Sequence, residues 1–160
     1  MTVATLALGS NLGERAANLD RAQAALAALP ASPIAASTRH ETPALLPPGA
    51  PADWDIPFLN AVVQVETDLA PAALLAAVKR IEHDLGRRPG PRWSPRLIDI
   101  DILAVGTAVH RGDGLEIPHP ELANRLFVLR PWAEIDPGWT HPHTGLTVAR
   151  MLADLESEPK

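Results

Sequence analysis

The chain has 160 residues, of which 46% are apolar and 21% charged, so its length and composition indicate one folded soluble domain and exclude a disordered chain. Its formal net charge of −5 argues against non-specific binding to nucleic acid, and the absence of cysteine excludes disulfides and cysteine-rich metal sites. The chain begins without the basic segment of a signal peptide and no apolar run reaches the roughly 18 residues of a membrane helix, so we expect a cytoplasmic protein that contacts no membrane.

The first part of the chain predicts a strand, a helix and a second strand. Val3–Leu8 is apolar and runs into glycine, serine and asparagine, the residues of a turn. Through Glu14–Leu29 leucines and alanines recur at spacings of three and four, which places them on one face of a helix, and Pro30 ends it. Ile34–Arg39 is predicted as the second strand.

A long loop and a third strand follow. Glu41–Pro57 is rich in proline and glycine, and loops of this length are usually functional or disordered. Phe58–Thr67 alternates between an apolar face and a second face that includes Phe58 and Asn60. An aromatic ring and an amide on one face could stack on and hydrogen-bond a flat heterocycle, or they could lie on an ordinary surface.

The second half predicts a helix, a basic loop and a fourth strand. Proline suits the first turn of the helix Pro71–Leu85, and Gly86 suits its end. The basic, proline-rich loop Arg87–Pro95 leads into the strand Leu97–Val105. The remaining expected elements are a polar hairpin or loop, a partly helical segment over His119–Ile135 and an amphipathic helix over Leu146–Leu155.

The order β-α-β-β-α-β plus a C-terminal extension predicts an α+β ferredoxin-like sandwich, with an antiparallel sheet and helices on one face. The other face would be free to carry a site. We expect residues 1–160 to form a single domain.

The fourth strand carries the strongest chemical signal. Alternation places Asp99 and Asp101 on one face and their isoleucine neighbours on the other. At a separation of about 6 Å two unit charges repel by roughly 3 kcal/mol at an effective dielectric constant near 20, and a cation would remove this repulsion. Carboxylates of this kind suit Mg²⁺ together with substrate phosphates, whereas the alternative is two exposed acids on a strand edge.

The context of the two aspartates favours the metal site. The segment Arg87–Arg96 includes four arginines, whose guanidinium groups match phosphate oxygens. Acids and arginines together indicate transfer of a phosphate group from a nucleotide. The chain lacks a P-loop motif, so an ordinary P-loop kinase is excluded.

Other polar residues leave both readings open. Glu82 lies one residue from the buried stripe of its helix and is a candidate acid near the metals, or a solvated glutamate. His119 is a candidate phosphate contact, or a structural turn histidine. His141 and His143 lack an evident third metal ligand and are interpreted as loop residues.

Five segments occur together in a fixed order, and as a set they resemble one known family. They are ALGSNLG at 7–13, FLNAV at 58–62, RWSPRLIDIDI at 92–102, IPHP at 117–120 and NRLFVL at 124–129. This set is similar to the 6-hydroxymethyl-7,8-dihydropterin pyrophosphokinases (2-amino-4-hydroxy-6-hydroxymethyldihydropteridine pyrophosphokinases) of folate biosynthesis. The match runs from about Val3 to Ile135.

The resemblance implies a reaction and a set of roles. ATP would donate its β,γ-pyrophosphoryl group to the hydroxymethyl oxygen of the reduced pterin and release AMP, with two Mg²⁺ ions held by Asp99 and Asp101. Arg87 and Arg96 would contact the phosphates and act in catalysis, and Arg92 and Trp93 would belong to a lid over both substrates. The implied pterin residues are Thr42, Pro43, Leu45, Phe58, Asn60, Trp93 and Phe127, and the implied nucleotide residues are Lys79, Glu82, Arg88, Arg92, Ile102, His119 and Arg125.

Two other functions remain open. One is a non-catalytic pterin- or nucleotide-binding module of the same fold, and the other is a different Mg²⁺-dependent phosphoryl or nucleotidyl transferase. The protein is expected to act as a monomer on ATP and the pterin, without nucleic acid. No side chain stands out as a general base for the hydroxyl proton.

Overall fold

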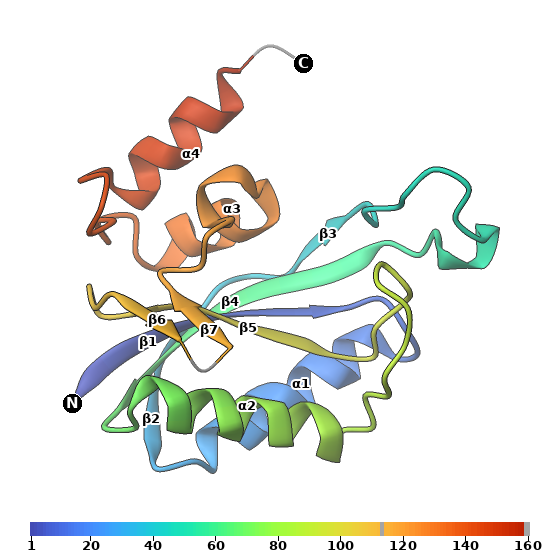
Figure 1. Ribbon diagram of the computed structural model, residues 1–160, viewed down its shortest axis with the longest axis horizontal. Coiled ribbons are helices and arrows are strands. Elements are labelled where there is room, and N and C mark those ends of the chain that lie inside the picture. Colours follow the sequence, from blue (N-terminus) through green and yellow to red (C-terminus); the bar gives the residue numbers. More distant parts are fainter. Residues whose placement is uncertain (113, 159–160) are drawn as a thin grey trace.

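The computed structural model describes residues 1–112 and 114–158, which form one α+β assembly around an antiparallel sheet (Figure 1). The strands are β1 (Thr2–Ser10), β2 (Ala31–Ala36), β3 (His40–Thr42), β4 (Phe58–Thr67), β5 (Asp99–Val105), β6 (His110–Gly112) and β7 (Leu115–Ile117). The helices are α1 (Arg15–Ala27), α2 (Pro71–Asp84), α3 (Leu126–Ile135) and α4 (Val148–Glu156), with short 3₁₀ turns at Ala52–Trp54 and Leu122–Asn124. None of the described helices is long and apolar enough to cross a membrane.

The main sheet has the strand order β2-β4-β1-β5, and β3 pairs with the other end of β4. All of these pairings are antiparallel, as the sequence predicts. The separate β6–β7 hairpin matches the predicted polar hairpin. The sheet thus places β1 between β4 and β5, and this arrangement brings the third and fourth predicted strands to either side of the first.

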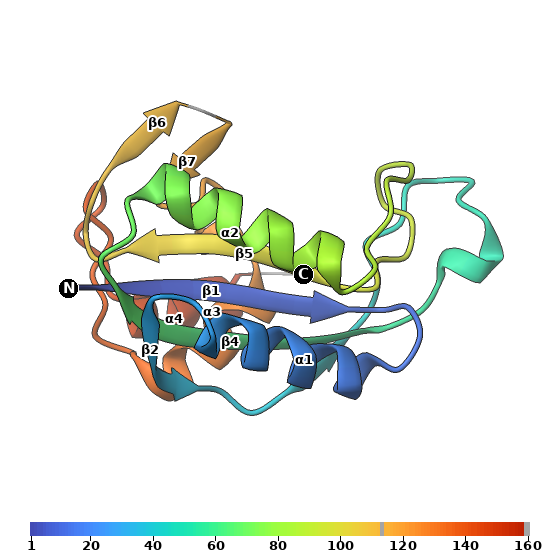
Figure 2. The ribbon, with the colours of Figure 1, turned by 90° about the horizontal axis from the view of Figure 1, so that it is seen from below.

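Helices α1 and α2 cover one face of the sheet side by side (Figure 2). Their apolar stripes pack against the alternate residues of the strands, so Leu19 and Leu74 are fully buried between helix and sheet, as are Leu6 and Ile98. Ile100 and Ile102 belong to the same cluster, which confirms that β5 turns its isoleucines toward the helices. The two aspartates of β5 therefore face the opposite side.

The opposite face is also partly covered, which differs from the expected one-sided sandwich. Helices α3 and α4 lie across it (Figure 1), and Trp132 packs there against Leu103 and Val62. Leu103 is an extra residue in β5, because Leu6 pairs with Ile102 while Thr5 pairs with Ala104. This bulge lets two consecutive residues, Leu103 and Ala104, join the second cluster. The C-terminal extension thus forms a second core layer at one end of the sheet.

The prediction of the second strand at Ile34–Arg39 lies too late in the chain, because the strand in the structure begins at Ala31. The strand instead ends at Ala36, and a separate short strand, β3, follows. The hydroxyl of Ser37 accepts a hydrogen bond from the Val62 N–H at 2.9 Å, while the Ser37 N–H donates to the Val62 carbonyl at 2.9 Å. A side chain thereby takes the place of a backbone partner, and the regular ladder ends.

The core predicts a clear contrast in stability. We expect Leu74→Ala to lower the free energy of unfolding by about 2–5 kcal/mol, because it leaves a cavity in the layer between α2 and the sheet. The half-exposed Leu146 offers a control of the same residue type, and Leu146→Ala should cost less than about 1 kcal/mol. Urea unfolding of both variants measures this difference, and equal costs would contradict the packing described.

Candidate active site

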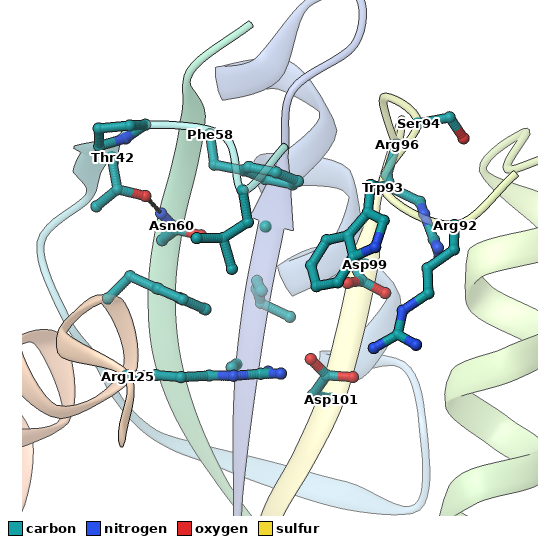
Figure 3. A pocket seen from close by; sticks show the side chains of 16 residues that line it. Thr42, Phe58, Asn60, Arg92, Trp93, Ser94, Arg96, Asp99, Asp101 and Arg125 are labelled. Carbon is teal, nitrogen blue, oxygen red and sulfur yellow. Dashed lines mark hydrogen bonds between the residues drawn. The ribbon is translucent and has the colours of Figure 1, made fainter. Parts of the chain in front are cut away.

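A cavity of about 220 Å³ opens on the part of the sheet that α3 and α4 leave free (Figure 3). The two long loops, 43–57 and 85–98, emerge at this same end of the molecule (Figure 1). The residues that line the cavity are Ala7, Leu8, Gly9, Thr42, Pro43, Leu45, Phe58, Asn60, Arg92, Trp93, Ser94, Arg96, Asp99, Asp101, Arg125 and Phe127.

The register of three strands lays out the floor of the cavity. Gly9 of β1 pairs with Asp99 of β5 on one side and with Asn60 of β4 on the other. Two residues along, Ala7 pairs with Asp101. Directly paired residues share a face, and neighbouring strands lie about 4.8 Å apart, so the carboxylate and the amide stand about 10 Å apart across a floor with almost no side chain.

Gly9 is required by this crowding. A Cβ atom at Gly9 would lie 3.1 Å from Asn60 Oδ1 and 3.4 Å from Phe58 Cδ1. Any larger residue would therefore push into the amide and fill the centre of the floor. A glycine inside a strand often marks such a close approach.

The carboxylates of Asp99 and Asp101 lie next to one another with incomplete compensation. Burial, followed by the charge of Asp99, raises the pKa of Asp101 to about 7, while the charge of Arg125 opposes both effects. In Figure 3 the Arg125 side chain extends across β1 toward Asp101. Asp99 has its own cation, since Arg87 Nη1 lies 3.4 Å from Asp99 Oδ1.

This pair fits a divalent cation that is shared with a ligand. Both groups are hard oxygen donors, and their mutual repulsion would be relieved by a cation. Among the described residues there is no cluster of three or more histidine or acidic side chains that could hold a metal by itself. Mg²⁺ commonly takes one or two carboxylates and completes its shell with water and phosphate oxygens, so the arrangement suits Mg²⁺ with a phosphate ligand.

A buried carboxylate on α2 holds Arg87 and β5 in place. Glu82, which is 2% exposed, accepts a hydrogen bond from the Ile100 N–H at 2.8 Å and forms an ion pair with Arg87, whose Nη1 lies 2.7 Å from the carboxylate. Burial raises the pKa of the Glu82 carboxyl, against the opposing effects of the Ile100 hydrogen bond and the Arg87 charge. Arg87 thus bridges a buried acid and Asp99.

The end of α2 explains how Arg87 reaches this position. Gly86 has φ of +106°, a left-handed conformation, and its N–H donates to the His83 carbonyl. The Arg87 N–H then donates to the Glu82 carbonyl at 3.0 Å. These two bonds form a Schellman motif, which turns the chain back over the last helical turn and directs Arg87 toward Glu82.

The opposite side of the cavity is aromatic and amide-bearing. Thr42 pairs with Phe58, and its hydroxyl accepts a hydrogen bond from Asn60 Nδ2 at 2.6 Å (Figure 3). Phe127, in the first turn of α3, provides a second ring, over which the Arg125 guanidinium lies at 5.6 Å from the ring centroid. Asn60 is buried, so its Oδ1 atom is an acceptor fixed in direction beside two aromatic rings.

The basic loop forms the wall of the cavity that faces the sheet floor. Arg92, Trp93, Ser94 and Arg96 all line it, and the Arg92 guanidinium lies 4.7 Å from the centroid of the Trp93 ring. The buried Asn11 anchors the base of the loop, since its Oδ1 accepts from the Arg96 N–H at 2.7 Å. Its Nδ2 donates to the Ile56 carbonyl at 3.1 Å, so one side chain joins the bases of both long loops.

Most of the site residues predicted from the sequence come together here. Those that line the cavity are Thr42, Pro43, Leu45, Phe58, Asn60, Arg92, Trp93, Arg96, Asp99, Asp101, Arg125 and Phe127. The others lie outside its lining. Arg87 contacts it through Asp99, Glu82 is buried behind β5, Lys79 lies 3.7 Å from Glu82, and Arg88 is exposed.

Two further predicted residues stand apart from the cavity. The side chain of Ile102 lies in the core between the sheet and α1 and α2, so only its backbone is available to a ligand. His119 is half-buried beyond Asp101, where burial and the Arg125 charge lower its pKa.

Sequence reasoning did not assign the cavity floor. Ala7, Gly9 and Ser94 line the cavity but were not predicted as site residues. For Gly9 a signal existed, because a glycine inside an apolar strand indicates a close approach of another group. For Ala7 nothing in the local pattern distinguishes a floor residue from a core residue.

The sequence comparisons with known proteins point to one enzyme family. A family model described as 7,8-dihydro-6-hydroxymethylpterin-pyrophosphokinase matches residues 5–137. A 2-amino-4-hydroxy-6-hydroxymethyldihydropteridine pyrophosphokinase of Methylorubrum extorquens is 43% identical over 157 residues, covering 98% of this chain and 95% of that protein. A folate synthesis bifunctional protein of Chlamydia caviae is 44% identical over 133 residues, covering 82% of this chain but only 30% of that protein.

Solved structures show the same fold in a longer chain. The wild-type HPPK-DHPS of Plasmodium falciparum with pteroate has a TM-score of 0.72 at 16% identity, and the match covers 96% of this chain and 42% of that one. The chain therefore spans less than half of the bifunctional proteins that it matches.

The raised pKa of Asp101 predicts a pH dependence of stability in metal-free buffer. The folded state binds the Asp101 proton more tightly than the unfolded state, whose carboxyl has the ordinary pKa of 3.8. The free energy of unfolding should therefore fall as pH rises between about 4 and 7, with a contribution from this group of at most about 1.4 kcal/mol per pH unit. Asp101→Asn should flatten this slope in urea unfolding with a chelator present.

A matched control is Asp53→Asn, on an exposed turn. It should keep the slope of the unmodified protein. Identical slopes for the unmodified protein and Asp101→Asn would contradict the assigned environment of this carboxyl.

Proposed function

The chain belongs to the 7,8-dihydro-6-hydroxymethylpterin-pyrophosphokinase family, and we propose that it transfers the β,γ-pyrophosphoryl group of ATP to the hydroxymethyl oxygen of 6-hydroxymethyl-7,8-dihydropterin, yielding AMP, in folate biosynthesis. One observation carries the proposal. A carboxylate pair beside arginines and an amide beside two aromatic rings share one sheet face and one cavity.

The nucleotide side is built on β5. Asp99 and Asp101 would hold two Mg²⁺ ions, which when bound neutralise phosphate charge and align the transferred group. Arg87 and Arg96 would contact the transferred phosphates, and the network around Glu82 keeps the first of these guanidinium groups beside Asp99. The remaining nucleotide contacts that we propose are Lys79, Arg88, Arg92, His119, Arg125 and the backbone of Ile102, while the buried Glu82 would act through Arg87.

The pterin side is built on β3, β4 and the start of α3. Phe58 and Phe127 would hold the two faces of the flat ring, and Asn60 would hydrogen-bond its edge. The hydrogen bond to Thr42 already fixes the Asn60 amide, so the side chain loses little conformational entropy when the ring binds. Pro43, Leu45 and Trp93 would cover the ring from the two loops.

This geometry suits an in-line transfer. The hydroxymethyl oxygen forms a bond to the β-phosphorus while the bond from that phosphorus to the oxygen bridging to the α-phosphate breaks, so AMP leaves with the bridging oxygen. The residues that would anchor the two substrates, on β5 and on β4, stand about 10 Å apart. The reacting groups would lie between these residues, above Gly9.

The loop that carries Trp93 supports a role as a lid. Trp93 has φ of 73°, in the left-handed region, which costs a residue with a bulky side chain roughly 1–2 kcal/mol. Strain of this kind in a cavity-lining loop favours a segment that changes conformation when ligands bind. A closed lid would exclude water, which otherwise competes with the pterin for the transferred group.

The wider organisation remains part of the proposal. The strand order β2-β4-β1-β5, with α1 and α2 on one face, supports a ferredoxin-like core. We propose that residues 1–160 act as one pyrophosphokinase domain, as a monomer in the cytoplasm and without nucleic acid.

Two alternatives differ in a measurable product. A different Mg²⁺-dependent transferase would use the aspartates but not the aromatic and amide wall, and a phosphoryl transferase would yield ADP instead of AMP. A non-catalytic binding module would yield neither. The carboxylate pair, Arg92 and Arg96 all line one cavity, which disfavours the non-catalytic module.

We predict AMP formation from ATP that depends on both Mg²⁺ and the reduced pterin. Asp99→Asn and Asp101→Asn should each lower the rate at least about 100-fold, because each removes one carboxylate that would hold the Mg²⁺ ions, which neutralise the phosphate charge. Chromatographic quantification of AMP and ADP tests both the reaction and the roles.

The control for these variants is Asp53→Asn, which should retain the full rate. Melting temperatures within a few degrees of the unmodified protein would show that the variants fold. ADP as the product, or full activity in either aspartate variant, would contradict the proposal.

A further inference from the structure

A carboxylate outside the cavity ties two of its walls together. Glu134 lies near the end of α3 and accepts hydrogen bonds from the Thr38 N–H at 2.8 Å and from the Thr38 hydroxyl at 2.8 and 3.0 Å. Its other oxygen pairs with His40 Nε2. The Thr38 backbone hydrogen bond, followed by the Thr38 hydroxyl and His40, lowers the pKa of Glu134, so the group is ionised at neutral pH.

The position of Glu134 on α3 shows which two parts of the cavity wall this contact connects. Arg125 caps the start of α3 and Phe127 lies in its first turn, and both line the cavity, whereas Glu134 lies in the last turn of the helix. The partners of Glu134 lie on the segment that enters β3, whose last residue is Thr42. Glu134 is therefore a link between the helix that carries one ring of the aromatic pair and the strand that fixes the amide and the other ring.

Strand β3 needs such a link. It has three residues, and among the described strands it pairs with β4 alone, through His40–Asn60, Glu41–Leu59 and Thr42–Phe58. A strand this short at a sheet edge is marginal without further contacts. The solvent-exposed cluster of Thr38, His40 and Glu134 supplies charge-assisted hydrogen bonds at its entry.

We propose that Glu134 is a positioning residue, which holds β3 against β4 and α3 and thereby fixes the geometry of the aromatic and amide wall that binds the pterin ring. This inference rests on the proposed function. It assigns no contact between Glu134 and either substrate. The carboxylate pair on β5 lies on the far side of β1 from this link, and α3 reaches it through Arg125, at the opposite end of the helix from Glu134, so nucleotide binding should change less than pterin binding.

The test compares Glu134→Gln with a charge-pair control on the same helix. Arg130 of α3 lies 3.3 Å from Glu156 of α4 in an exposed pair, so Glu156→Gln also removes one carboxylate bound to this region. Calorimetry first measures binding of a Mg²⁺-bound non-hydrolysable ATP analogue and then binding of the dihydropterin to that complex. Hydrogen exchange of the β3 amides is followed in the same proteins.

We expect Glu134→Gln to weaken dihydropterin binding by about tenfold, while the Kd of the ATP analogue changes by less than about twofold. Exchange of the β3 amides that donate to β4 should accelerate. Thr38→Val, which removes the hydroxyl donor, should act in the same direction, and Thr38→Ser, which keeps it, should restore binding. Glu156→Gln should change none of these quantities.

The outcomes separate this inference from the proposed function. Unchanged pterin affinity in Glu134→Gln and Thr38→Val would overturn the positioning role alone. Equal weakening of pterin binding and of ATP-analogue binding would do the same. Failure of the unmodified protein to bind the dihydropterin would overturn the proposed function, and unchanged β3 exchange in Glu134→Gln would then also overturn the link itself.

Discussion

The whole site depends on the register of β1 between its two neighbours. Because Gly9 is paired with Asp99 on one side and with Asn60 on the other, two chemically different walls face one floor. A slip of β1 by one residue would turn its leucines toward the cavity and its floor residues toward the helices. The fully buried leucines of β1, which alternate with the floor residues, prevent this slip, so the same packing that stabilises the fold also fixes the site.

Electrostatics then distinguish the two walls. On β5 the chain places two carboxylates together and compensates them unequally, with Arg87 beside Asp99 and Arg125 facing Asp101. The cost is carried by Asp101, whose pKa is raised to about 7. On β4 and β3 the polar groups that line the cavity, Asn60 and Thr42, are uncharged, and the Thr42 hydroxyl accepts a hydrogen bond from Asn60. The first wall therefore suits a cation with an anionic ligand, and the second suits a neutral flat ring.

The sequence predicted those parts of the site that depend on local periodicity. Alternation alone placed Asp99 and Asp101 opposite the isoleucines, and it placed Phe58 with Asn60, because the side-chain period of a strand is two. The glycine at position 86 likewise indicated where α2 ends, and the structure confirms it.

The remaining parts depend on contacts between segments far apart in the sequence. The network of Glu82 with Ile100 and Arg87 requires the turn after α2 to fold back over its last turn, which no spacing in the sequence reveals. The covering of the second face by α3 and α4 depends on the bulge at Leu103, which is invisible in an uninterrupted apolar run. The link from Glu134 to Thr38 joins residues 96 positions apart and could be found only in the folded chain.

The central claim is that one cavity holds a metal-bound nucleotide and a flat ring on opposite sides of Gly9. A crystal structure of the protein with Mg²⁺, a non-hydrolysable ATP analogue and 6-hydroxymethylpterin tests it most directly. The account predicts metal density in contact with both Asp99 and Asp101, and a ring between Phe58 and Phe127 with its edge on Asn60. Metal or ring density elsewhere, with this cavity still empty, would contradict it.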